Sequence, residues 1–89
     1  MINQDEMSED EFDLIDELYF VQHFNDLKDI LGWDEAKLLA TLQSLYQKEF
    51  IKCLIAPDEE IFGNIEFNPN GKDYFYLATK KGLMNHNSL

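Results

Sequence analysis

The feature that most restricts the fold is a glycine between two stretches of helical periodicity. Apolar side chains recur at helical spacing over 26–31, and Asn25 is a good N-cap for such a helix. Gly32 follows, and glycine readily takes the left-handed conformation that ends a helix. Asp34 then precedes a longer amphipathic stretch, which predicts a second helix from Glu35 to Lys48. A short helix, a tight turn and a longer helix are therefore expected in succession.

A capping signal predicts a further helix before this pair. Ser8 and Glu11 form a capping box, in which each side chain can bond to the backbone N–H of the other residue. Apolar residues then recur at helical spacing, so we predict a helix from Ser8 to Val21. A break is expected over 22–24.

After residue 49 the pattern changes to that of strands. Runs rich in β-branched and aromatic residues predict strands over 50–55, 61–67 and 73–78. Asn68–Gly71 reads as a turn whose glycine accepts a positive φ, and Thr79 is expected to cap a last helix over 80–85. Residues 1–7 and 86–89 are expected to fray, which leaves one domain over 8–85.

Three segments in this order resemble the small bacterial winged-helix transcription regulators. The sequence LKDILGW (27–33) is similar to the end of their second helix and its turn. The sequence LQSLYQKEFI (42–51) is similar to their third helix entering the wing, and YLATKKG (76–82) to the return strand entering the closing helix. The resemblance covers residues 10–85. It implies an α+β winged helix-turn-helix domain with three to four helices and a two- to three-stranded antiparallel wing.

The charge is concentrated at one end of the chain. The net charge is −11, and residues 1–35 hold twelve carboxylates against one lysine, whereas residues 36–89 hold six of each. This acidity argues against a nonspecific nucleic-acid coat, because Lys and Arg carry phosphate binding. The acidic N-terminus also lacks the pattern of a secretory signal, and a single cysteine cannot form an internal disulfide. We therefore expect a cytoplasmic protein.

The resemblance implies a DNA-binding surface on the third helix and the wing. The helix face opposite the leucine stripe of residues 35–48 holds no carboxylate. Lys37, Ser44 and Gln47 would read bases, and the other implied DNA contacts are Thr41, Lys48, Asn70, Lys72, Lys80 and Lys81. The first functional hypothesis is therefore a DNA-binding transcription regulator. The absence of arginine weakens it, since Arg to guanine is the commonest specific base contact.

The alternative hypothesis is a protein-interaction module that does not bind DNA. The first helix would present Asp13, Asp16, Glu17 and Phe20 to a basic partner. A dimer would also have to use this helix, and the candidate contacts are Leu14, Phe20 and Val21.

Other chemistry has little support in the sequence. Zinc needs about four clustered ligands, and the chain offers only His23, His86 and Cys53 at distant positions, so no metal or cofactor is expected. Cys53 lies among apolar residues and is predicted to be a core residue. No phosphate loop or nucleophile motif is present, and no apolar run is long enough for a membrane span, which predicts neither an enzyme nor a membrane protein.

Overall fold

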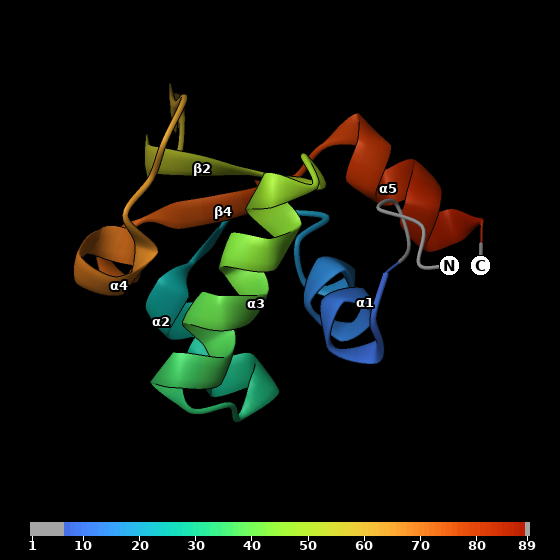
Figure 1. The fold of residues 1–89 in the computed structure, drawn as a ribbon, viewed down its shortest axis with the longest axis horizontal. Coiled ribbons are helices and arrows are strands. Elements are labelled where there is room, and N and C mark those ends of the chain that lie inside the picture. Colours follow the sequence, from blue (N-terminus) through green and yellow to red (C-terminus); the bar gives the residue numbers. More distant parts are fainter. Residues whose placement is uncertain (1–6, 89) are drawn as a thin grey trace.

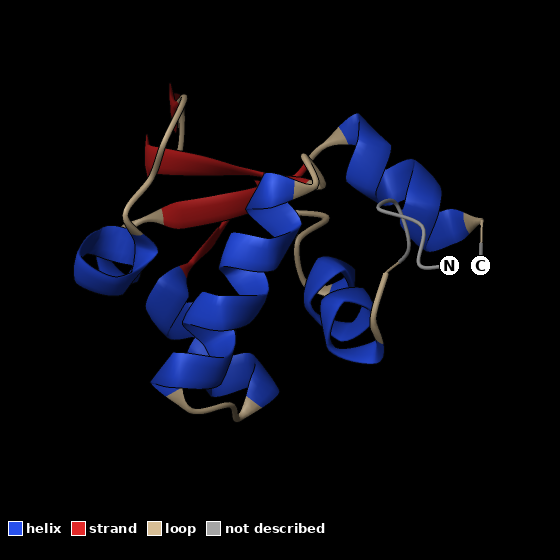
Figure 2. Cartoon of the chain, in the orientation of Figure 1, coloured by secondary structure: helices blue, strands red, loops and turns tan. Residues whose placement is uncertain are grey.

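A four-stranded antiparallel sheet and five α-helices make up residues 7–88, which are the residues that the computed structural model describes (Figure 1). The strands lie side by side in the order β1-β4-β2-β3, and α1, α2 and α3 group beside them (Figure 2). In chain order the elements are α1 (Glu9–Asp16), β1 (Gln22–His23), α2 (Phe24–Leu31), α3 (Glu35–Gln47), β2 (Ile51–Ala56), β3 (Glu59–Ile61), α4 (Phe67–Asn70), the 3-10 helix η1 (Gly71–Asp73), β4 (Phe75–Ala78) and α5 (Lys80–Asn87). The predicted α+β class is confirmed.

The glycine turn between α2 and α3 is confirmed. Gly32 has a φ of 68° and ends α2, and its N–H donates to the carbonyl of Lys28. The side chain of Asp34 accepts from the N–H of Lys37 at 2.8 Å and starts α3. The predicted N-cap of α2 is wrong, because His23 Nδ1 accepts from the N–H of Asn25 at 3.1 Å and the helix begins at Phe24, two residues earlier than predicted.

The capping box at the start of α1 is confirmed, but the predicted helix to Val21 is wrong. The helix ends at Asp16, and the carbonyl of Leu18 accepts from the N–H of Ala78 at 2.9 Å. This bond draws the chain to the end of the sheet, where Gln22 pairs with Tyr76. A short strand, β1, therefore replaces the break expected over 22–24.

The predicted strand over 61–67 is also wrong for most of its length. The strand β3 ends at Ile61, and Gly63 follows with a φ of 87°. Phe67 is buried between Tyr46 and Tyr76, and it begins α4 instead of ending a strand. Burial of this aromatic ring outweighs the local preference for strand.

The expected turn at 68–71 is helical instead, so these residues are not the tip of a wing. Gly71 has a φ of −59°, and its lack of a side chain matters for space, since an added Cβ would lie 2.7 Å from Leu39 Cδ2. The chain reverses between β2 and β3 at Pro57 and Asp58. The tip of the hairpin therefore lies at 57–58 and not at 68–71.

The core lies where α1, α2 and α3 meet the sheet. It includes Leu14, Leu18, Phe24, Leu27, Leu38, Leu42, Leu45, Phe50, Cys53, Phe67 and Tyr76. Cys53 is confirmed as a core residue, and burial raises the pKa of its thiol to about 12. Because the thiolate is the reactive form, this cysteine is inert at neutral pH.

The C-terminal end is more ordered than the sequence predicts. The helix α5 continues to Asn87, and the ring of His86 stacks on Phe12 with 4.1 Å between ring centroids. Fraying of 86 and 87 is therefore wrong. Met7 packs against the core, while the predictions for residues 1–6 and 89 lie outside the described residues.

The position of Gly82 gives a test of how α5 is attached. A Cβ at this residue would lie 2.1 Å from the carbonyl oxygen of Phe50, so Gly82→Ala must push α5 away from Phe50, the residue before β2. We expect the variant to lose about 3 kcal/mol of unfolding free energy, at the upper end of overpacking costs. Urea denaturation followed by circular dichroism measures this free energy.

Gly32→Ala is the control, because its Cβ meets open space and only the backbone strain of about 1 kcal/mol applies. Equal losses in the two variants would contradict the close approach.

Candidate interaction surface

The polar face of α3, predicted to read DNA, is in contact with the first turn of α1. Glu11 is 3% exposed, and its carboxylate accepts from Lys48 Nζ at 2.7 and 2.9 Å and from Ser44 Oγ at 2.8 Å. Asp10 Oδ1 lies 3.4 Å from Lys37 Nζ. Two carboxylates of α1 therefore lie against a helix face that holds no carboxylate of its own.

The Glu11 carboxylate is held in its ionised form. Burial raises its pKa, but the hydrogen bonds from Lys48, the backbone N–H of Ser8 and Ser44 together outweigh burial and lower the pKa below the ordinary value of 4.5. The same side chain thus caps α1 and joins it to α3. In the sequence, the capping box indicates that Glu11 caps α1, but it does not indicate the bonds of Glu11 to α3.

The other residues predicted to contact DNA are divided among separate places. Thr41 is buried, and its hydroxyl donates to the carbonyl of Lys37 at 2.8 Å. Gln47 is exposed, and it lines a cavity together with the loop at Gly63 and Asn64. Thr41 therefore offers no exposed side chain to a ligand, whereas Gln47 does.

The predicted wing contacts do not lie at the hairpin tip. Asn70 ends α4, and Lys72 lies in η1 with its Nζ 3.3 Å from Glu35 Oε1, beside the start of α3. The tip itself presents Asp58 and Glu59, which are exposed carboxylates. A DNA backbone would meet negative charge at this hairpin.

The side of α1 that faces away from α3 keeps its carboxylates in solvent. Asp13 and Asp16 are exposed and Glu17 is half-buried. Phe20 follows in the loop to β1 and is 78% exposed. These four predicted partner contacts therefore combine an acidic surface with an accessible aromatic ring. Leu14 is fully buried, so its predicted role in a dimer contact is wrong.

The acidic side of α1 is fixed in place by α5. Tyr19 Oη lies 2.8 Å from Nδ1 of His86 and donates to the side chain of Asn87 at 3.1 Å. His86 Nε2 is buried at 3.8 Å from Asp16 Oδ1. Sequence reasoning missed this junction, because the two segments are more than 60 residues apart.

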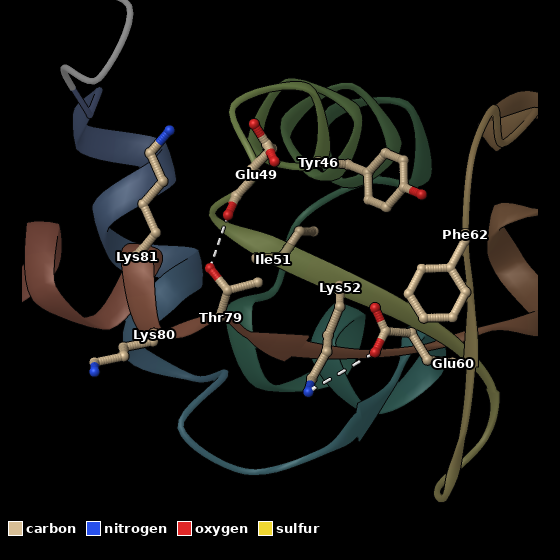
Figure 3. Close-up of a pocket in the computed structure, with 9 residues that line it drawn as sticks. All are labelled: Tyr46, Glu49, Ile51, Lys52, Glu60, Phe62, Thr79, Lys80 and Lys81. Carbon is tan, nitrogen blue, oxygen red and sulfur yellow. Dashed lines mark hydrogen bonds and ion pairs between the residues drawn. The ribbon is translucent and has the colours of Figure 1, made fainter.

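A groove of about 520 Å³ opens between the end of α3, the β2–β3 hairpin and the start of α5. Figure 3 shows Tyr46 and Phe62 on one side, Thr79 and Lys81 on the other, and Ile51 between them. The remaining lining residues are Glu49, Lys52, Glu60 and Lys80. Apolar atoms make up most of the surface that lines the groove, and side chains of both charges surround it.

Two contacts define the shape of the groove. The Tyr46 hydroxyl donates to the carbonyl of Gly63 at 2.8 Å, which fixes the loop beside Phe62. At the opposite side the Thr79 hydroxyl donates to the carbonyl of Glu49 at 2.7 Å. Phe62 is 78% exposed, so the groove presents an aromatic ring to solvent.

Comparison with protein-family models, curated proteins and solved structures returns no match. Among residues 7–88, no three His, Cys, Asp or Glu side chains are grouped as metal ligands would be. None of the helices described is both long and apolar enough to cross a membrane. The surface therefore has to be interpreted from its own geometry.

The bonds of Glu11 predict a specific loss of stability in acid. Because the folded-state pKa is lowered, the stabilisation by Glu11 is complete above its ordinary value of 4.5 and is lost as the pH falls through the folded value. Glu11→Gln should cost about 1–3 kcal/mol of unfolding free energy at pH 7. It should also flatten the decline of that free energy below pH 4.5.

Urea titrations at several pH values measure both effects. Asp13→Asn on the solvent side is the control, and a slope as flat as that of Glu11→Gln would refute the assignment.

Proposed function

We propose that this chain is a protein-interaction module on a winged-helix-like scaffold. It binds a basic partner through the acidic side of α1 and Phe20. The scaffold is suggested by the α2–Gly32–α3 turn, followed by the β2–β3 hairpin and the return strand β4. The observation that carries the proposal is the burial of Glu11 against Lys48 and Ser44, because it places a carboxylate on the surface that DNA reading would need.

DNA reading would require two unfavourable changes at α3. The carboxylates of Asp10 and Glu11 lie beside the polar face of the helix, so a phosphate backbone would approach fixed negative charge. Freeing Lys48 for a phosphate would also leave the buried carboxylate of Glu11 without its strongest bond, which costs several kcal/mol. The DNA-binding hypothesis remains a prediction, but the geometry favours its alternative.

Docking of a protein at α1 requires no such rearrangement. Asp13 and Asp16 already lie in solvent, and Phe20 can enter a pocket of a partner without leaving the core. Aromatic side chains are frequent anchors of protein interfaces, and surrounding charges direct the approach of a partner of opposite sign. The chemistry at α1 therefore suits a basic surface that contains an apolar pocket.

Selection from a random peptide library against the immobilised full-length chain tests this surface. Basic peptides with apolar residues should be enriched. Phe20→Ser or the pair Asp13→Asn and Asp16→Asn should each weaken their binding at least tenfold, or about 1.4 kcal/mol. Matched controls on α2 are Ile30→Ser and the pair Asp26→Asn and Asp29→Asn, because these residues are also exposed. Peptides that bind the Phe20 variant as well as the unchanged chain would refute the proposal.

A parallel selection with random duplex DNA at low salt tests the other hypothesis. We expect no enriched sequence, because the carboxylates of α1 remain beside α3. An enriched duplex whose binding is lost in Gln47→Ala or Lys80→Ala would support DNA reading and overturn the proposed function.

A further inference from the structure

Four of the six exposed large apolar residues in 7–88 belong to the loop after α1, the border of the groove or α5. Tyr19 and Phe20 lie in the loop after α1, Phe62 borders the groove, and Met84 is one helical turn after Lys80. Their exposed fractions are 39, 78, 78 and 61%. Large exposed apolar side chains gathered in one region indicate an interaction surface.

The loop that carries Phe20 and the groove adjoin each other. The carbonyl of Leu18 accepts from the N–H of Ala78, and the next two residues, Thr79 and Lys80, line the groove. Tyr19 binds His86 on the same helix α5. An aromatic projection and a hollow with an aromatic wall therefore lie next to each other on one chain.

The two halves of this region differ in charge. The half formed by α1 presents Asp16 and Glu17. The edge of the groove at α5 presents Lys80, and the carboxylates that line the groove, Glu49 and Glu60, belong to its other sides. A purely basic partner spanning both halves would meet Lys80, and a purely acidic one would meet α1. A partner complementary to both halves would place a basic surface against α1 and an acidic surface against Lys80.

We propose that this partner is a second copy of the chain, bound across a twofold axis. Phe20 of each copy enters the groove of the other and packs on Tyr46 and Phe62, and the acidic end of α1 faces Lys80. A twofold contact of this kind requires that both complementary surfaces reach the partner, and the bond between Leu18 and Ala78 places the loop of Phe20 beside the groove edge at Thr79 and Lys80. The inference rests on the proposed function, since it identifies the basic surface that α1 binds.

The open volume and the charge distribution are consistent with such a contact. The volume of the groove, about 520 Å³, is within the range of ligand-binding pockets, so the groove has room for an aromatic side chain. The ammonium group of Lys80 extends outward from its edge (Figure 3), where an approaching acidic helix would meet it. The net charge of −11 opposes association at a distance, but screening over about 8 Å at 0.15 M salt limits this repulsion.

Sedimentation equilibrium of the full-length chain at about 0.15 M salt measures the association. We expect a monomer–dimer equilibrium with a dissociation constant below about 1 mM. Phe20→Ser and Phe62→Ser should each raise that constant at least tenfold, whereas Ile30→Ser on α2 should leave it unchanged. Circular dichroism checks that each variant is folded. A chain that stays monomeric throughout, or a Phe62→Ser variant that dimerises normally, would overturn the inference.

Charge reversal tests the pairing of the two halves directly. Lys80→Glu and Glu17→Lys should each weaken self-association, because each variant places like charges together at both contacts. An equimolar mixture should restore a heterodimer, since one contact keeps its original pair and the other has the reversed pair. A mixture that associates no better than either variant alone would refute the pairing. If the chain is monomeric but Phe20-dependent peptides are still selected, only the choice of partner fails and the proposed function stands.

Discussion

The carboxylate of Glu11 is the interaction on which the arrangement of the helices depends. It accepts from the N–H of Ser8, from Ser44 and from Lys48, so a single buried group both starts α1 and attaches it to α3. A buried carboxylate is costly unless donors surround it, and here three donors do. The direction of α1 follows from this attachment, and with it the choice of which carboxylates lie inward and which remain in solvent.

Local signals predicted the parts of the fold that local chemistry controls. The capping box at Ser8, the left-handed Gly32 and the cap at Asp34 are each decided by residues within one helical turn, and all three are confirmed. The errors occur where distant segments compete with local preference. The bond from Ala78 to Leu18 ends the first helix early, and the packing of Phe67 on Tyr76 turns a predicted strand into a helix.

The candidate site shows the same division. Exposure of Asp13 and Asp16 agrees with the pattern of a helix with an acidic outer face, whereas Phe20 lies in the loop after the helix. The bond between Glu11 and Lys48 could not be read from the sequence, because the two residues are 37 residues apart and nothing local relates them. The groove was missed for the same reason, since Tyr46, Phe62 and Lys81 meet only after three separate elements have packed.

Under the proposed function, the division of charge on α1 would make DNA reading and protein docking alternative uses of one helix. While Glu11 holds Lys48, the inner side of α1 neutralises α3 and the outer side is available to a partner. If α1 left α3, Lys48 and Ser44 would be released, but the docking surface would lose the support that orients it. Leu14, Ile15 and Leu18 are fully buried on the same segment, so its departure would also expose much of the core. The cost of that exposure keeps α1 in place, which favours the docking state.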